Sequence, residues 1–212
     1  MHDRLTELRT SELISRLATS DPAPGGGSAA ALAGALAAGL VEMVVALTSG
    51  RAAAAEHEAE LTSIGSDAMA LRQQLVELTD ADASAYEAVV AARRLSRTTD
   101  LERIERDARL GDATIEATLI PLRTLRAAAE VFDLAERLAP IGNRNASSDV
   151  GVAALLASTA AHGAALNVRI NLAYLADGDP LADQARAEIA QRLEGLDRRA
   201  ASVLEAIEAG IG

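Results

Sequence analysis

The fold of this chain is constrained most strongly by a glycine-rich segment and the apolar run that follows it. The segment is Pro22-Ala23-Pro24-Gly25-Gly26-Gly27-Ser28, and the apolar run covers residues 29–47. The prolines and glycines oppose regular structure, and Ser28 is a good N-cap residue, so we expect a helix to begin there. The run contains one charged residue, Glu42, and its alanines and leucines favour a helix of about 20 residues, roughly 30 Å long. A glycine-rich turn is therefore predicted to lead into a buried central helix.

The start of such a helix presents free backbone N–H groups and the positive end of the helix dipole, and both attract an anionic ligand group. A flexible linker followed by a simple helix cap is the alternative interpretation. The segment lacks the lysine of a phosphate-binding P-loop, and no predicted strand precedes it as in a dinucleotide-binding fold. The turn by itself leaves both interpretations open.

The rest of the composition is typical of an all-helical protein. Half of the 212 residues are apolar, the only aromatic residues are two Tyr and one Phe, and alanine, leucine and arginine dominate. A chain of this length can bury a large core, so we expect one helical domain over residues 1–212. Residues 29–47 could be mistaken for a membrane span, but their many Ala and Gly residues and Glu42 favour a helix inside a soluble bundle.

Charge and residue usage disfavour several function classes. The net charge is −11 and all 20 basic residues are arginine, so nucleic acid or an anionic membrane would meet long-range repulsion. The lack of cysteine excludes disulfides and thiolate chemistry. His2, His57 and His162 have no metal-ligand spacing, so no metal site is expected. The charged N-terminus is unlike a signal peptide, and we expect a cytoplasmic protein.

Helical patterns cover most of the chain. They predict helices over residues 5–17, 29–47, 52–95, 101–138, 147–175 and 181–211. Gly50 is expected to end the central helix, and Pro121 must kink its helix or start a new one. Because the connections are short, the pattern predicts an all-α, mainly antiparallel bundle with two buried Ala/Gly-rich central helices, over 29–47 and 147–175.

Two segments together form a recognisable pattern. They are Pro22-Ala23-Pro24-Gly25-Gly26-Gly27-Ser28 with residues 29–36, and Gly142-Asn143-Arg144-Asn145-Ala146-Ser147-Ser148-Asp149 with residues 150–154. These segments resemble the cyclodeaminase/cyclohydrolase family, and weaker agreement lies at Asp82-x-x-Ala85-Tyr86, at Pro121-Leu122, and over residues 167–172. The family includes the cyclodeaminase domain of formiminotransferase-cyclodeaminase and bacterial methenyltetrahydrofolate cyclohydrolase. Its usual Gly-Lys-Lys after the first buried helix is replaced by Gly50-Arg51-Ala52.

The resemblance implies a homodimer that acts on a one-carbon unit held on a tetrahydrofolate derivative, the substrate, without a metal. Methenyltetrahydrofolate cyclohydrolase is the first expectation, and formiminotetrahydrofolate cyclodeaminase is the alternative. A further alternative, favoured by the missing second basic residue after Gly50, is a helical dimer that binds folate or a partner protein without catalysis.

Asp82 and Asp149 are the candidate catalytic residues, because a carboxylate can stabilise the cationic one-carbon group and transfer a proton at nitrogen. The alternatives are a helix cap for Asp149 and a solvated charge for Asp82, which shares its helix with Asp80. Tyr86 lies four residues after Asp82 and so shares its helix face. Only Tyr86, Phe132 or Tyr174 could stack on the pterin from this chain.

The candidate substrate-binding residues supply backbone N–H groups, amides, a hydroxyl or guanidinium groups. They are Gly25, Gly26, Gly27, Ser28, Arg51, Asn143, Arg144, Asn145, Ser148, Asn167, Arg169 and Asn171. The three arginines suit the carboxylates of folate, although each could instead form a surface ion pair. The asparagines could bind the pterin ring or shape the turn, and Asn167 and Asn171 could equally bond helix to helix. We expect the two glycine-containing turns to converge on one folate pocket, within a subunit or across a dimer interface.

Overall fold

The computed structural model describes residues 4–211, and within that range it contains helices and no strands, which confirms the all-α class. The α-helices are α1 (Thr10–Leu17), α2 (Gly26–Thr48), α3 (Glu58–Arg93), α4 (Asp100–Leu138), α5 (Ser147–Leu172), α6 (Pro180–Leu193) and α7 (Leu196–Ile211). Three short 3-10 helices lie between them: η1 (Leu5–Glu7), η2 (Ala52–His57) and η3 (Arg144–Ala146).

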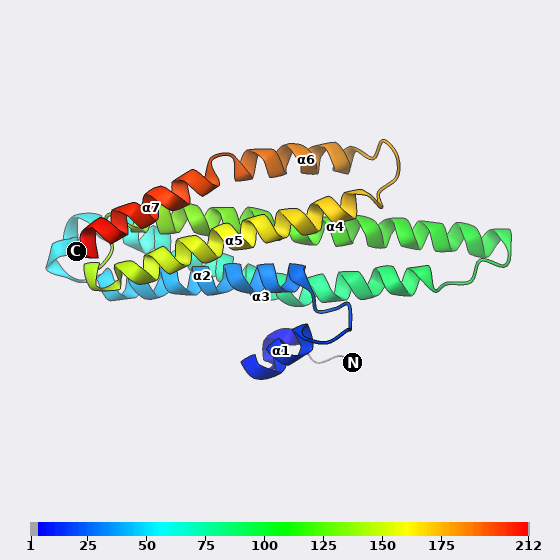
Figure 1. Ribbon diagram of the computed structural model, residues 1–212, viewed down its shortest axis with the longest axis horizontal. Helices are drawn as coiled ribbons and strands as arrows, with labels where there is room; N and C mark the ends of the chain where they lie inside the picture. Colours follow the sequence, from blue (N-terminus) through cyan, green and yellow to red (C-terminus); the bar gives the residue numbers. More distant parts are fainter. Residues whose placement is uncertain (1–3, 212) are drawn as a thin grey trace.

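Helices α2, α3, α4 and α5 form a bundle in which consecutive helices run antiparallel (Figure 1). Each of the four packs against the one before and after it, and α5 closes the ring against α2. Helices α6 and α7 pack outside the bundle on α4 and α5. Because α3 and α4 are much longer than α2 and α5, the α3–α4 hairpin extends past the start of α2 (Figure 1).

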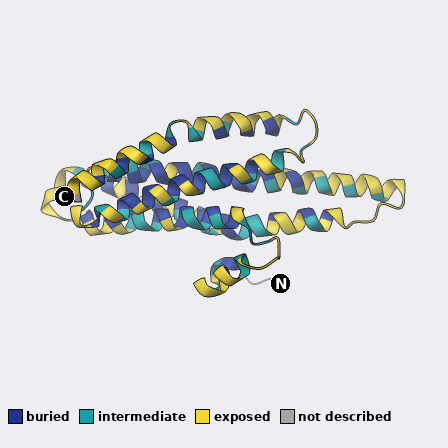
Figure 2. Ribbon diagram, viewed as in Figure 1, coloured by how far each residue is buried: buried dark blue, intermediate teal, exposed yellow. Residues whose placement is uncertain are grey.

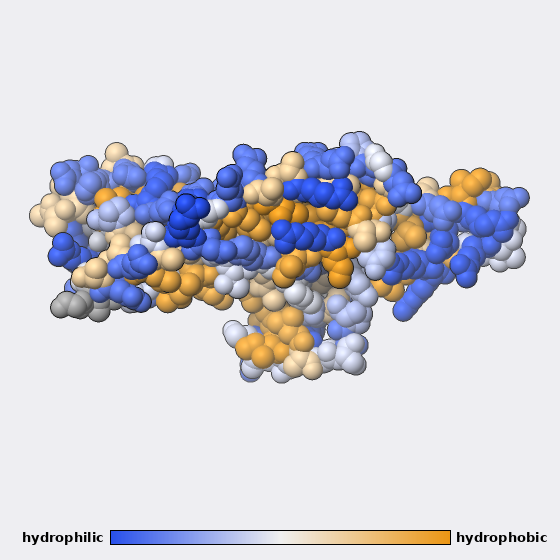
Figure 3. Space-filling model, turned by 45° about the horizontal axis from the view of Figure 1, so that its top comes forward, coloured by the Kyte–Doolittle hydropathy of each residue, from blue (hydrophilic) through white to orange (hydrophobic). Residues whose placement is uncertain are grey.

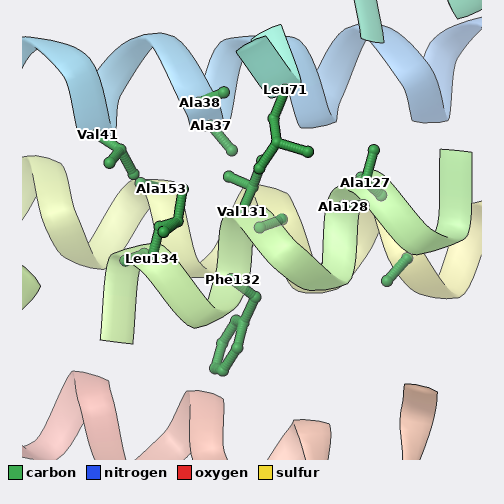
Figure 4. Close-up of a cluster of buried hydrophobic side chains, with 14 of the residues drawn as sticks. Ala37, Ala38, Val41, Leu71, Ala127, Ala128, Val131, Phe132, Leu134 and Ala153 are labelled. Carbon is green, nitrogen blue, oxygen red and sulfur yellow. The ribbon is translucent and has the colours of Figure 1, made fainter. Parts of the chain in front are cut away.

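Small side chains build the core, so the helix backbones approach closely. Ala37 and Ala38 of α2 and Ala127 and Ala128 of α4 are buried in this core, together with larger side chains such as Val131 (Figure 4). Phe132 points to the other side of α4, toward α7 (Figure 4), where the Arg199 guanidinium lies 4.9 Å from its ring centroid. Phe132 is therefore a core residue and is not placed to contact a substrate.

The two Ala/Gly-rich helices, α2 and α5, each have a buried face and an exposed face (Figure 2). On α2, Leu36, Met43 and Leu47 are exposed, and on α5 the exposed side chains include Leu166 and Ile170. By length and composition alone, α2 and the stretch from Arg144 to Leu172 could cross a membrane, with 50% and 56% of the tested window buried. About half of each tested window is thus buried against the other helices of the bundle.

The new helix that Pro121 could have started is not found, because α4 runs through this residue from Asp100 to Leu138. Proline lacks an N–H group, so the carbonyl four residues earlier loses its helical partner. That carbonyl belongs to Ala117, and the Asn171 side-chain Nδ2 of α5 donates a hydrogen bond to it at 2.6 Å. A neighbouring helix thus satisfies the group that proline leaves free.

Other predicted helix boundaries are also wrong. The helix expected over residues 5–17 is divided into η1 and α1, with Leu8 and Arg9 extended between them. The final helix is divided into α6 and α7 at Gly195, which has a φ of +69° that other residues rarely adopt. Helix α2 begins at Gly26, with Gly25 as its extended N-cap residue, so Ser28 lies in the first turn and is not the cap. Gly50 has the positive φ, +75°, expected of a glycine that ends a helix.

Candidate active site

Asp82 of α3 lies against the first turn of α2. The Ser28 hydroxyl donates a hydrogen bond to Asp82 Oδ2 at 3.0 Å, and the Ser28 backbone N–H donates to the same carboxylate. Gly27 makes this approach possible, because a Cβ atom added there would lie 2.0 Å from Asp82 Oδ1. The carboxylate therefore occupies the position of a helix cap, although it comes from a different helix.

The Asp82 carboxyl is largely withdrawn from solvent at this position. Burial raises the pKa of Asp82 above its ordinary value, and the hydrogen bonds from the Ser28 hydroxyl and backbone N–H oppose that rise. A carboxyl with a raised pKa exchanges a proton closer to neutral pH than an ordinary aspartate does. This side chain therefore combines a fixed position with a raised pKa.

Asn167 of α5 approaches the same turn from the other side. A Cβ atom on Gly26 would lie 3.6 Å from Asn167 Nδ2, which donates to the Gly163 carbonyl at 2.9 Å. The first N–H groups of α2 have no partner inside the helix. The structure thus brings together Gly25, Gly26, Gly27 and Ser28 with Asp82 and Asn167.

Beyond the start of α2, only α3, α4 and α5 continue the bundle. Tyr86 and Arg93 follow Asp82 on the same face of α3, four and eleven residues later. The Arg93 guanidinium lies 5.2 Å from the centroid of the Tyr174 ring, which follows the end of α5. The sequence analysis did not identify Arg93. Its spacing from Asp82 was the available signal.

A cavity of about 880 Å³ lies between the N-terminal segment and α3, and neither Asp82 nor Asn167 lines it. Its lining includes Pro22, Pro24 and Tyr86 beside the glycine-rich turn, and Arg16 and Arg94 farther out. Asp80 holds the segment in place, because its carboxylate accepts hydrogen bonds from the Thr6 N–H at 3.2 Å and the Thr6 hydroxyl at 2.7 Å. The volume lies in the range of small-molecule sites.

The second predicted cluster lies at the opposite end of α2. The Asn143 N–H donates to Thr48 Oγ1 at 2.9 Å, and Asn143 Nδ2 donates to the Leu47 carbonyl at 3.3 Å. Arg51 follows the same end of α2, and Arg144, Asn145, Ser148 and Asp149 follow Asn143 in η3 and the first turn of α5. Convergence of the two turns within one subunit is therefore wrong, because α2, at 1.5 Å per residue, separates them by roughly 30 Å.

The remaining candidates divide between structural and surface positions. Asn171 supports the Ala117 carbonyl, as described above, and Arg169 is exposed on α5. His162 pairs with Asp197 of α7 at 2.8 Å. In residues 4–211 no group of three or more His, Asp or Glu side chains is arranged to hold a metal ion.

Comparison with known proteins identifies the family. The family model described as formiminotransferase-cyclodeaminase matches residues 9–191. The chain is 43% identical over 191 residues to a methenyltetrahydrofolate cyclohydrolase of Methylorubrum extorquens, covering 90% of this chain and 89% of that protein. It is 35% identical to the formimidoyltransferase-cyclodeaminase of Rattus norvegicus, covering 88% of this chain but only 34% of that longer protein.

A solved structure gives the same result. The formiminotetrahydrofolate cyclodeaminase of Thermotoga maritima is 26% identical, with a TM-score of 0.77 and 96% of each chain covered. The family match spans most of the chain, and the fold agrees over nearly its whole length. The chain therefore belongs to the formiminotransferase-cyclodeaminase family.

Proposed function

We propose that this protein is a methenyltetrahydrofolate cyclohydrolase. The observation that carries the proposal is the partly buried Asp82 carboxyl, hydrogen-bonded to Ser28 at the start of α2, in a chain 43% identical to an enzyme of that name. A tetrahydrofolate derivative is the substrate, and the reaction needs water and a proton acceptor but no metal. The protein acts in the cytoplasm, without a nucleic-acid or membrane partner.

Asp82 is the proposed catalytic residue of the α2 cluster. Its carboxylate accepts a proton from the water that attacks the methenyl carbon, and it then protonates the ring nitrogen as the carbon–nitrogen bond breaks. The hydroxyl of the tetrahedral intermediate loses its proton to solvent as the formyl carbonyl forms, so the reaction releases one proton overall. The negative charge also stabilises the cationic substrate before attack. The N–H groups of Gly26 and Gly27 and the amide of Asn167 bind polar atoms of the pterin.

The proposed active unit is a homodimer formed through the exposed apolar face of α2 and α5. This face carries Leu36, Met43 and Leu47 of α2 and Leu155, Leu166 and Ile170 of α5, and apolar side chains gather at mid-length of the bundle in Figure 3. A two-fold axis across these antiparallel helices would place the start of α2 opposite the partner's second cluster. The partner's second cluster would then complete the site, with Asp149 as the second carboxylate. The other residues that it would supply are Arg51, Asn143, Arg144, Asn145 and Ser148.

Cyclodeaminase activity is the alternative, because ring closure with loss of ammonia uses the same amidine carbon and also needs proton transfer at nitrogen. It is favoured by the Thermotoga maritima structure. A non-catalytic folate- or partner-binding dimer is the third possibility, and only turnover measurements separate it from the others.

The test is to assay the purified protein with both substrates. Loss of methenyltetrahydrofolate absorbance at rates well above spontaneous hydrolysis supports the cyclohydrolase, whereas ammonia release from formiminotetrahydrofolate supports the cyclodeaminase. Calorimetric binding of tetrahydrofolate without turnover of either compound would leave the non-catalytic dimer. No binding and no turnover would contradict all three.

A further inference from the structure

The face of α3 that carries Asp82 continues as an arginine-bearing surface beyond the start of α2. Arg93 lies eleven residues after Asp82, three helical turns along the same face, or about 16 Å at 1.5 Å per residue. Helical side chains lean toward the N-terminus, so the Arg93 side chain extends back toward Asp82. Tyr86 lies between them on this face.

The contacts of Arg93 leave its charge available. Among residues 4–211, arginines such as Arg72, Arg126 and Arg199 form ion pairs with carboxylates of neighbouring helices, whereas Arg93 forms none. It instead stacks on Tyr174, with 5.2 Å between its Cζ atom and the ring centroid. Stacking holds the guanidinium plane but leaves its edge N–H groups free to bind a carboxylate with two hydrogen bonds.

We propose that Arg93, held by Tyr174, binds the glutamate carboxylate of the folate substrate and so places its one-carbon unit at Asp82. This inference rests on the proposed function. In folate, the aminobenzoyl ring and an amide bond separate the reacting nitrogens from the glutamate. Asp82 and Arg93 lie about 16 Å apart along α3, and because the Arg93 side chain extends back toward Asp82, the two groups suit the two ends of this part of the molecule. The aminobenzoyl ring then lies beside Tyr86.

The other arginine candidates are less suitably placed within this chain. Within one subunit Arg51 and Arg144 lie at the far end of α2, and the proposed dimer places them with Asp149 at the start of α2, about 16 Å from Arg93 along α3. Arg169 lies two residues from Asn167, so it points away from the face that Asn167 shares with α2. Arg94 lines the cavity next to α1, on a different side of α3 from Asp82. Arg94 is the alternative residue of α3's C-terminal end that could bind the glutamate carboxylate, from the cavity side.

The experiment compares two substrates and three arginine variants. Steady-state kinetics are measured with methenyltetrahydrofolate and with methenyltetrahydropteroate, which lacks the glutamate. Arg93→Gln should raise KM about tenfold for the folate, the loss expected for one charge-assisted contact, while leaving kcat and the KM for the pteroate unchanged. Arg97→Gln removes the same charge just beyond the end of α3 and should leave KM within about twofold.

Tyr174 is a positioning residue, so Tyr174→Phe should keep the wild-type KM because the ring remains, whereas Tyr174→Leu should raise KM for the folate alone. An unchanged KM in Arg93→Gln, or a larger effect in Arg94→Gln, would overturn the assignment of Arg93 while the wild-type activity stands. A wild-type protein that turns over neither substrate contradicts the proposed function, and the assignment of Arg93 falls with it.

Discussion

At the scale of single residues, the contact between Gly27 and Asp82 is the most demanding feature of the site. A Cβ atom at Gly27 would meet the Asp82 carboxylate at 2.0 Å, whereas one at Gly26 would meet Asn167 at 3.6 Å, an ordinary contact. We expect Gly27→Ala to displace Asp82, to cost about 1–3 kcal/mol of stability and to remove activity. Gly26→Ala should keep the fold stability within about 1 kcal/mol.

Urea denaturation and turnover of both variants test this expectation. Gly26 and Gly27 have no positive φ, so alanine strains the backbone at neither position and the pair isolates the contact with Asp82. If Gly27→Ala were as stable and as active as the wild type, Asp82 would not be held as the structure describes.

The raised pKa of Asp82 links its chemistry to stability. The folded-state pKa lies above the unfolded value, so folding favours the protonated form. The stability that this group contributes is complete below the unfolded pKa and is lost as pH rises through the folded-state pKa. Asp82→Asn should remove this pH dependence and be more stable than the wild type at neutral pH, while kcat falls at least about a hundredfold.

Denaturation midpoints measured across the acidic range check the sign of this effect. Ser28→Ala serves as the comparison, because it removes the hydroxyl that lowers the Asp82 pKa and should raise that pKa further. A variant Asp82→Asn that loses stability at neutral pH would show that the carboxylate acts mainly as a cap for α2.

The identity of these residues was only partly predictable from the sequence. Asp82 and Tyr86 were recognised by their spacing and by the family pattern, but periodicity alone could not show that Asp82 faces Gly27, because the residues lie 55 positions apart in separate helices. Arg93 carried no motif. The eleven-residue spacing between Asp82 and Arg93 points to a shared site only when the structure shows that α2 begins beside Asp82.

At the scale of elements, Pro121 shows how a neighbouring helix preserves a long α-helix. Asn171 was expected to bind substrate, yet its amide donates to the Ala117 carbonyl that Pro121 leaves free. Asn171→Ala should cost about 1 kcal/mol, the usual net value of one hydrogen bond. In a Pro121→Ala background an alanine N–H can satisfy Ala117, so the same substitution should cost less.

A double-mutant cycle measured by urea denaturation gives the coupling energy between the two positions. If the cycle shows no coupling energy, Asn171 does not compensate for the N–H group that Pro121 lacks. A large change in KM for Asn171→Ala would instead support a role for this residue in substrate binding. Thr118, a buried neighbour whose hydroxyl bonds to the Thr114 carbonyl, gives the control Thr118→Val.

The elements themselves were largely predictable, because long apolar or periodic stretches identify helices well. Two of the wrong predictions lie at a glycine and a proline, residues that can either interrupt a helical pattern or lie within a continuous helix. Gly195 lies in a helical pattern that a positive φ interrupts, and Pro121 lies in one that continues because another helix supplies a donor. Neither the φ angle nor the donor can be read from the neighbouring residues.

At the scale of the whole molecule, the two glycine-containing turns lie at opposite ends of α2. Helix α5 runs antiparallel to α2, so its first turn lies beside the last turn of α2, as the contacts between Asn143 and Thr48 show. The sequence order of two motifs could not reveal this separation. Only a second subunit, related by a two-fold axis across α2 and α5, would bring Asp149 to the start of α2.

Subunit mixing tests that arrangement. Asp82→Asn and Asp149→Asn should each abolish turnover alone, yet coexpression should restore it, because a mixed dimer has one site with both substitutions and one with neither. Half of the dimers in an equal mixture are mixed and each has one intact site of two, so about a quarter of wild-type activity should return. Coexpression of Asp82→Asn with Gly27→Ala should restore none, because both substitutions damage the same cluster and every site keeps one of them. Equal failure of both pairs would contradict a site shared between two subunits.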